Sequence, residues 1–390
     1  MEGHVGLKAI NAAAAGSVSP TQIPKAPVVS AGPSDRLCEN LQRKQIPGLN
    51  ALRGGAALAV VASHRLMGLA QVGSLAVQMF FLLSGLLITW TMLTERERTG
   101  HLNLRRFYIR RALRLLPGLS VLLLMEILVD QPYASGKAIA SSFVYVSNYY
   151  VAICGNGVLG GLGHTWSLAV EEHFYFLWPM VFCFCYSRRL VVWVGAAAAL
   201  SAGIRYGVDS FVSSNYAYYS TESNAFAILA GCALALWLWG RRIIPRFLLW
   251  RPLLLVSLVI LVLGAKWIPS AIVTRFAALW TLPLAVILLQ SIAYEWRVLE
   301  NPCMSLLGRI SYSIYLWHLV ASQLVLGHGL TGLARAGTLF GSAIAFGAVS
   351  YFLVERPVQE WGRRRFLAQS PNRRGASGPP GALAQQTGPR

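Results

Sequence analysis

Long apolar runs alternate along the chain with short connections that are rich in arginine. A run of about 20 apolar residues is long enough for a helix to cross the hydrocarbon core of a bilayer. Ten runs have roughly this length, at 51–70, 75–93, 113–130, 168–186, 190–204, 224–240, 252–268, 271–291, 310–327 and 334–354. The pattern predicts an all-α polytopic membrane protein, a bundle of about ten transmembrane helices.

The two ends of the chain lack this pattern. Residues 1–48 mix Ala, Gly, Pro and Ser without a helical period, and the C-terminal end is basic and of low complexity. Segments of this composition bury too little apolar surface to fold alone. We therefore expect a disordered cytoplasmic segment at 1–48, one membrane domain at 49–358 and a disordered basic cytoplasmic tail at 359–390.

Composition and charge agree with a membrane location. Hydrophobic residues make up 55% of the chain and charged residues only 13%, about half the share usual in soluble domains. A net charge of +19 could indicate a nucleic-acid-binding protein, but most basic residues fall in the two terminal segments and in alternate connections between the spans. This positive-inside pattern predicts a multi-pass protein of the inner (plasma) membrane, with both termini in the cytoplasm and no nucleic-acid partner.

The first span, "LNALRGGAALAVVASHRLMG", carries Arg53 and His64. At 100° per residue the two side chains share one helix face, about 16 Å apart along the axis. A snorkelling arginine and a core histidine would be the structural interpretation, whereas Arg65 directly after the histidine favours a functional site. Small residues at 54–57 would let another helix or a ligand approach the backbone closely.

Two further stretches lie in the second span and in the connection that leads into the third span. In "MFFLLSGLLITW", Ser84 and Gly85 suit a packing contact between helices. In "RRFYIRRALRLLPG", Arg111 and Arg114 fall at the expected start of an outward-pointing helix. Cations are unfavourable beside the positive end of a helix dipole, so a bound anion such as a CoA phosphate would relieve the repulsion. Ordinary positive-inside charge is the alternative.

The stretch "HTWSLAVEEHFYFLWP", residues 164–179, places adjacent carboxylates, Glu171 and Glu172, between His164 and His173. Charged side chains at membrane depth usually form ion pairs or hydrogen bonds, or have a functional role. A helix dipole favours acidic residues near a helix start, but two carboxylates beside a histidine exceed what a helix start requires. The stretch is therefore a candidate for part of an active site.

The ninth span, "RISYSIYLWHLV", puts Ser311, Tyr315 and His318 on one helix face as a polar stripe. A hydrogen-bonded contact between helices is the alternative interpretation. The cysteines lack the spacing of a metal site, and no phosphate-binding loop or dinucleotide fingerprint is present. We expect no metal and no bound cofactor.

Taken together, six ordered stretches resemble the acyltransferase-3 family of integral membrane O-acyltransferases. They are "LNALRGGAALAVVASH", "FFLLSG", "RRALRLLP", "HTWSLAVEEHFYFLWP", "SYSIYLWH" and "VERP". The resemblance runs from about residue 46 to 358 and implies a ten-helix bundle. It also implies that a cytoplasmic acyl-CoA, commonly acetyl-CoA, donates its acyl group to a hydroxyl of a sugar, glycolipid or polyketide glycoside.

The resemblance also marks individual positions. It implies that Arg53 and His64 are essential and that Arg111 and Arg114 contact the donor. The remaining motif positions are Glu171 and Glu172, taken as catalytic, and Ser84, Trp166, Ser167, Tyr312 and His318, taken as substrate-binding. The chain departs from the family at His173, where Gln is common, and at Asn224 and Phe226, where many members carry Arg and Asp.

A buried, neutral His64 is expected to act as the general base for the acceptor hydroxyl, while Arg53 holds the donor or the developing negative charge. His318 is the second candidate for the base. No cysteine with a neighbouring base is apparent, which favours direct transfer over an acyl-enzyme.

The expected acceptor is a hydroxyl of a surface polysaccharide, lipopolysaccharide or other glycan. A macrolide-type or other secreted small molecule is the alternative acceptor. A lipid-linked sugar carrier or flippase is the competing class of protein, and it would not need an arginine pair at a cytoplasmic helix start.

Overall fold

The computed structural model describes residues 37, 39–41, 46–65, 69–128, 135–240, 244–294, 296–326 and 330–367. Within these ranges every regular element is a helix, which confirms the all-α prediction. The longer helices are α2 (Pro47–Arg65), α3 (Ala70–Thr99), α4 (Leu104–Leu128), α7 (Thr165–Cys185), α8 (Leu190–Phe211), α10 (Thr221–Gly240), α11 (Arg251–Trp267), α13 (Ala277–Ala293), α14 (Pro302–Leu326) and α15 (Gly332–Ser350).

Short elements join the long helices. They are α5 (Gly136–Phe143), α6 (Ser147–Cys154), η1 (Gly160–Leu162), α9 (Ser214–Tyr219), η2 (Arg246–Leu249), α12 (Ser270–Arg275), the π-helical turn η3 (Tyr351–Glu355) and α16 (Arg356–Phe366). The segments α5, α6 and η1 fill the long connection between α4 and α7, and α9 and α12 lie in connections next to α8 and α13.

Each of the ten predicted spans overlaps one of the ten longer helices. Five stretches among the described residues are long and apolar enough to cross a membrane: Ala70–Thr99, Thr165–Cys185, Leu190–Phe211, Ser214–Gly240 and Gly332–Phe366. The protein is therefore a multi-pass membrane protein.

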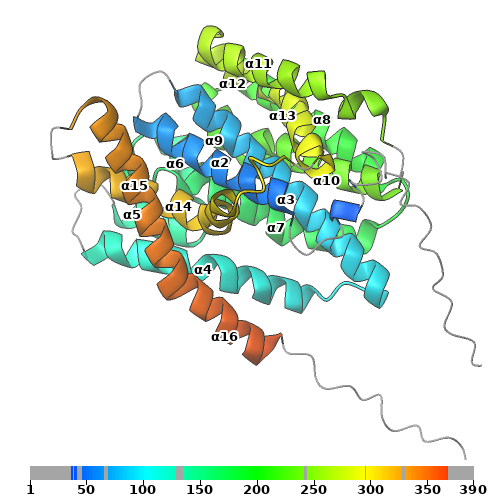
Figure 1. The fold of residues 1–390 in the computed structure, drawn as a ribbon, viewed down its shortest axis with the longest axis horizontal. Helices are drawn as coiled ribbons and strands as arrows, with labels where there is room; N and C mark the ends of the chain where they lie inside the picture. The colour runs from blue at the N-terminus through cyan, green and yellow to red at the C-terminus, as the bar shows by residue number, and fades with distance from the viewer. Residues whose placement is uncertain are drawn as a thin grey trace, which may run out of the picture. The chain divides into compact units, whose positions relative to one another are not determined.

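The bundle is built around α3. This helix lies between α2 and α10 in Figure 1 and has the longest series of buried residues, from Gly73 to Leu93. Its contact with α10 depends on Gly85 and Gly231, because a Cβ on either glycine would overlap the backbone of the opposite helix. Small residues that let two backbones meet are the usual solution for helix association in lipid. The packing interpretation of Gly85 is thus supported.

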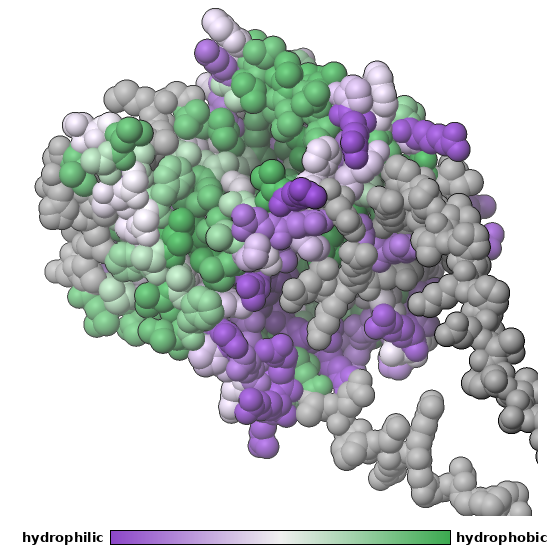
Figure 2. All heavy atoms as spheres, in the orientation of Figure 1, coloured by the Kyte–Doolittle hydropathy of each residue, from purple (hydrophilic) through white to green (hydrophobic). Residues whose placement is uncertain are grey.

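The outer helices present apolar side chains to their surroundings. Leu255, Val259 and Val262 of α11 and Trp193 of α8 are largely exposed. Figure 2 shows apolar residues over α11 at the top, whereas hydrophilic residues gather over α16 at the bottom. Apolar surface of this extent is expected where helices contact lipid.

The structured region extends beyond the boundaries expected from sequence. Leu37 and Leu41, inside the segment expected to lack structure, are buried, and Asn40 donates a hydrogen bond of 2.7 Å to the carbonyl of Ile292. At the other end, α16 continues past residue 358 to Phe366 and packs against α4. The hydropathy of these short segments did not reveal them because their stability comes from contacts with the bundle.

The α3–α10 contact generates a stability prediction. Gly85→Ala should lower the free energy of unfolding by about 1–3 kcal/mol, because the added methyl group forces the two helices apart. Gly55→Ala is the matched control, since Gly55 is exposed and a Cβ there meets nothing within 4 Å. The measurement is the midpoint of thermal unfolding in detergent. Equal midpoints for the two variants would contradict the proposed contact.

Candidate active site

Five helices converge on a narrow cavity of about 50 Å³. Its lining residues are Arg53 from α2; Val77, Phe80, Phe81 and Ser84 from α3; Arg111, Arg114 and Leu115 from α4; Ser167, Leu168, Glu171 and Tyr175 from α7; and Ser311, Tyr312 and Tyr315 from α14. Seven of the eleven residues predicted for the site from sequence line this cavity: Arg53, Ser84, Arg111, Arg114, Ser167, Glu171 and Tyr312.

The cavity brings three arginines together from two helices, Arg53, Arg111 and Arg114. The Nε atoms of Arg53 and Arg111 are buried without a hydrogen-bond partner. Arg111 lies over the ring of Tyr175, with its Cζ 3.1 Å from the ring centroid, and its Nε is 3.9 Å from an oxygen of Glu172. Buried donors of like charge that lack partners are suited to an anionic ligand.

Glu171 is held by a short chain of hydroxyl groups. Ser84 Oγ donates to Glu171 Oε1 at 2.8 Å, and the Tyr175 hydroxyl donates to Ser84 Oγ at 2.6 Å while lying 3.2 Å from Glu171 Oε2. Glu171 therefore faces the cavity with a fixed orientation. Ser84 thus has a polar role in addition to the packing role of the adjacent Gly85.

The neighbouring residues of Glu171 point elsewhere. Glu172 does not line the cavity. Its Oε1 is buried and lies 3.9 Å from Arg111 Nε, but it accepts no hydrogen bond from any described residue. His173 lies 2.7 Å from the Thr221 hydroxyl and stacks on the ring of Tyr149. Consecutive residues of a helix point about 100° apart, so only one member of this run can enter the cavity fully.

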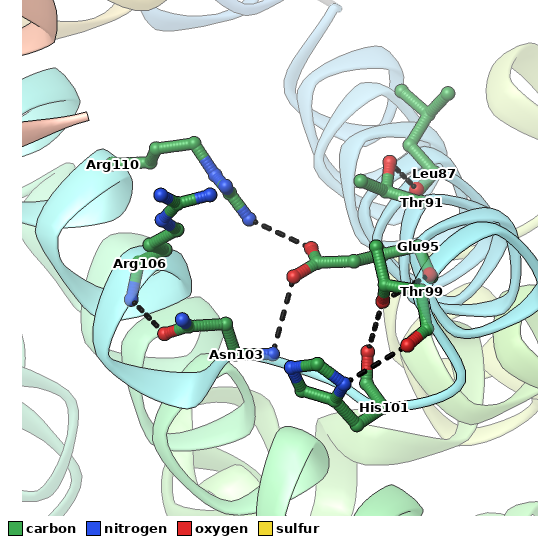
Figure 3. Close-up of polar contacts among 8 residues, drawn as sticks. All are labelled: Leu87, Thr91, Glu95, Thr99, His101, Asn103, Arg106 and Arg110. Carbon is green, nitrogen blue, oxygen red and sulfur yellow. Dashed lines mark hydrogen bonds and ion pairs between the residues drawn. The ribbon is translucent and has the colours of Figure 1, made fainter. Parts of the chain in front are cut away.

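Figure 3 shows how the helix that carries the arginine pair is anchored. Glu95 near the end of α3 accepts hydrogen bonds from the backbone of Asn103 and from Arg110, each at 3.1 Å. The side chain of Asn103 accepts a bond from the backbone N–H of Arg106 and so caps the first turn of α4. These contacts fix the turn between α3 and α4 and hence the position of the cavity arginines.

The helix start expected near Arg111 is wrong. The arginine-rich turns that precede the apolar run are helical, so α4 begins at Leu104, and Arg111 and Arg114 lie two to three turns inside it. A helix dipole acts mainly within the first turn. Burial beside Arg53, rather than the dipole, is therefore the physical reason why this pair suits an anion.

A second polar group consists of three histidines: His64 of α2, His318 of α14, and His164 in the turn directly before α7. The rings of His64 and His318 have centroids 4.8 Å apart, and those of His164 and His318 are 5.2 Å apart. His318 and His164 are buried. His64 is exposed, contrary to the sequence-based expectation, because α2 ends at Arg65 and places His64 in its last turn.

The contacts of the rings define their tautomers. His318 Nδ1 lies 2.6 Å from the carbonyl oxygen of Tyr315, and His64 Nδ1 lies 2.9 Å from that of Val60. A carbonyl only accepts, so in a neutral ring the proton resides on Nδ1 and the lone pair on Nε2. His318 Nε2 is also 3.4 Å from His64 Nδ1. His318 therefore helps to orient His64, whose Nε2 carries the basic lone pair.

Tyr315 joins the arginine cavity to the histidines. It lines the cavity, and its hydroxyl contacts Ser167 and donates to the carbonyl of His164 at 3.1 Å. Along α2, Arg53 and His64 are about 16 Å apart. The polar residues thus form two layers, an arginine–glutamate layer and a histidine layer, with Tyr315 and Ser167 between them.

Two positions singled out from sequence lie outside both layers. Trp166 is buried against the rings of Phe81, Tyr218 and Tyr219 and does not line the cavity. Asn224 accepts a 2.9 Å hydrogen bond from the buried Arg205 of α8.

Asn224 also donates to the carbonyls of Tyr218 and Ser220. It therefore ties α8, α9 and α10 together.

Some residues of the site escaped sequence analysis. Tyr175 stands one helical turn after Glu171, but its contacts with Ser84 and Arg111 could not be read from the sequence. Glu95 gave no signal because its role depends on a turn between two helices. Tyr312, expected to bind substrate, lines the cavity while donating to the carbonyl of Leu115 at 2.8 Å. Among the described residues no group of His, Cys, Asp and Glu is arranged to hold a metal ion.

The acyltransferase-3 family model, described as an acyltransferase domain, matches residues 46–354. The chain is 29% identical over 359 residues to the peptidoglycan O-acetyltransferase OatA of Listeria monocytogenes, covering 82% of this chain and 57% of that protein. It is 28% identical over 373 residues to the O-acetyltransferase OatA of Staphylococcus aureus, covering 85% of this chain and 60% of that protein.

The chain thus spans about three fifths of the length of these curated relatives. No solved structure matches it. The family match covers nearly all of the described helices, including every residue of the cavity and of the histidine layer. The chain therefore belongs to the acyltransferase-3 family.

Proposed function

We propose that the protein is a membrane O-acyltransferase that moves an acyl group, most simply acetyl, from cytoplasmic acyl-CoA to a hydroxyl of a cell-surface glycan. The single observation that carries this proposal is the cluster of under-partnered arginines, joined through Tyr315 to a pair of oriented histidines. In this proposal all ten longer helices cross the inner membrane, and both termini lie in the cytoplasm.

The arginine layer would bind the donor. Arg53, Arg111 and Arg114 offer charged donors for the phosphates of CoA, and guanidinium groups bind phosphate well. Arg53 is about 16 Å along the helix from His64, too far to touch a group that reacts at the histidine. We therefore assign Arg53 to the donor rather than to the negative charge that develops in the transition state.

The histidine layer would carry out the transfer. His64 Nε2 takes the proton of the acceptor hydroxyl as that oxygen attacks the thioester carbonyl. The C–S bond then breaks, the acyl group stays on the acceptor oxygen, and the proton passes from His64 to the departing CoA thiolate. The distance between the layers suits a donor whose thioester sits at the end of the long pantetheine arm.

Glu171 would act from the arginine layer. Fixed by Ser84 and Tyr175, its carboxylate faces the same cavity as Arg53 and Arg114. Before the donor binds, this carboxylate would partly compensate the positive charge of the three arginines. It would also orient their guanidinium groups for the phosphates of the donor. We accordingly assign Glu171 and Glu172 a positioning role in donor binding.

A glycan is the acceptor that the relatives favour, since one of them is named a peptidoglycan O-acetyltransferase. A secreted small molecule with a hydroxyl is the second candidate. A carrier for a lipid-linked sugar is disfavoured. It would not need a cluster of arginines with unsatisfied hydrogen-bond donors on the side of the bundle opposite the histidines.

The donor assignment predicts a selective kinetic defect. Arg111→Ala and Arg114→Ala should each raise the KM for acetyl-CoA by ~10–100-fold, the value of a lost charge-assisted hydrogen bond, with little change for the acceptor. Radiolabelled acetyl-CoA incubated with proteoliposomes provides the assay.

Arg105→Ala is the control, because Arg105 is exposed on the same helix. Absence of any labelled product from the native protein would reject the transferase; an unchanged KM for acetyl-CoA in both variants would reject the arginine cluster as its donor site.

The histidine pair predicts unequal losses. His64→Ala removes the base and should lower kcat by ~10²–10⁴-fold. His318→Ala removes only an orienting contact, so kcat should fall less. Both variants should keep the KM for acetyl-CoA, because the arginine layer is intact. The assay is acyl transfer at matched amounts of folded protein. A dead His318 variant beside an active His64 variant would reverse the two roles.

The membrane orientation is tested by labelling single cysteines in intact cells. Residues 94–111 should react only after the membrane is opened, as expected for a cytoplasmic connection, whereas residues 135–160 should react with an impermeant reagent from outside. The charge distribution of the connections is the reason for this expectation. Labelling of 94–111 from outside would contradict access of cytoplasmic CoA to the arginine layer.

A further inference from the structure

A buried glutamate lies at the end of α4 that is remote from the arginines. Glu126 is 5% exposed, whereas Leu124, Ile127 and Leu128 around it are more than half exposed. Its side chain therefore faces the interior of the bundle while its neighbours face outward. Its Oε2 is buried and has no hydrogen-bond partner among the described residues. Glu126 is about 18 Å along α4 from Arg114, so the donor layer does not explain it.

The carboxylate points at a glycine in the connection before α7. A Cβ built on Gly161 would lie 2.6 Å from Glu126 Oε1 and 3.3 Å from Gln323 Nε2. Side chains from α4 and α14 thus converge on the backbone of η1. Only glycine leaves this approach open, and its φ is not in the left-handed region, so backbone conformation is not the reason for it.

His164 adjoins the same glycine. Both of its ring nitrogens are buried without a hydrogen bond of normal geometry, although backbone groups of Gly161 and Leu316 lie near the ring. The ring is 5.2 Å from that of His318. Glu126, His164 and Gln323 therefore extend the histidine layer on the side away from the arginines.

Buried polar atoms without partners cost free energy, and a bound ligand that supplies matching hydrogen-bond partners removes this cost. A carboxylate oxygen accepts from a hydroxyl, and imidazole and amide groups can both donate and accept. Closely spaced groups of this kind complement the neighbouring hydroxyls of a sugar ring. Hydrogen bonding of this type also discriminates strongly against molecules that lack the hydroxyl.

We propose that Glu126, His164 and Gln323 around Gly161 form a subsite that binds a sugar acceptor through hydroxyls next to the one that is acylated. This inference rests on the proposed function, because it places the acceptor on the side of the histidine layer opposite the donor. Glu126 is a binding residue in this scheme and takes no part in proton transfer.

A substitution can separate this role from a structural one. Met fills nearly the same volume as Glu but carries no oxygen, and replacing an unsatisfied buried charge by an apolar group is commonly neutral or stabilising. Glu126→Met should therefore leave the unfolding midpoint unchanged or raised. It should also raise the KM for soluble peptidoglycan fragments by ~10-fold or more, with the KM for acetyl-CoA unchanged.

Two nearby glycines, Gly161 in η1 and Gly163 directly after η1, provide an independent variant and its control. Gly161→Ala places a methyl group against Glu126 and should also raise the KM for the fragments. Gly163→Ala is the control, since a Cβ there would make only ordinary contacts, the nearest at 3.4 Å. All variants are compared as full-length protein in proteoliposomes with radiolabelled acetyl-CoA.

The outcomes distinguish this inference from the proposed function. If the native protein consumes no acetyl-CoA, both fail. If it acetylates the fragments, and neither Glu126→Met nor Gly161→Ala changes their KM, the subsite alone is wrong. A lower unfolding midpoint together with equal changes in both KM values for Glu126→Met would show a structural glutamate and would also overturn the subsite.

Discussion

Three guanidinium groups lie close together inside this membrane protein, and holding them there costs free energy. The rest of the structure must offset that cost. Arg53, Arg111 and Arg114 repel one another and are only partly compensated by Glu171 and Glu172. Such a cluster persists only where the surrounding helices are fixed by contacts of their own. The close contact between α3 and α10 at Gly85 and Gly231 holds α3, and the turn fixed by Glu95 holds α4.

The fixed helices also keep the proposed site of donor binding apart from the proposed site of acyl transfer. The cavity at the arginines is lined by Arg53, Arg111 and Arg114 and therefore favours an anionic ligand. In the proposed mechanism the donor would enter from this side. The acceptor would then reach the histidines from the other side, where Glu126 has a buried oxygen without a hydrogen-bond partner among the described residues. Tyr315 lies between the arginine–glutamate layer and the histidine layer and contacts both.

Sequence reasoning picked out many residues of the arginine cavity but little of its geometry. Arg53, Ser84, Glu171 and Tyr312 could be found because each stands out as a polar residue in an apolar, recognisable motif. Their convergence on one cavity, and the wider role of Glu95, could not be read because these depend on contacts between helices distant in sequence. The start of α4 was misplaced because its first turns are rich in arginine, so hydropathy missed a helix that Asn103 caps.

The exposure of His64 changes how its basicity must be maintained. A fully buried histidine would be kept neutral by desolvation, but a histidine in the last turn of α2 is accessible. Orientation must then come from specific contacts, namely the carbonyl of Val60 and the ring of His318, which itself is fixed by the carbonyl of Tyr315. The ring of Tyr315 lines the arginine cavity and also lies 5.6 Å, between centroids, from the ring of His318, so a donor that displaces this tyrosine would act on His318 and, through it, on His64. The geometry therefore allows occupation of the donor layer to change the orientation of the base, without any direct contact between the two layers.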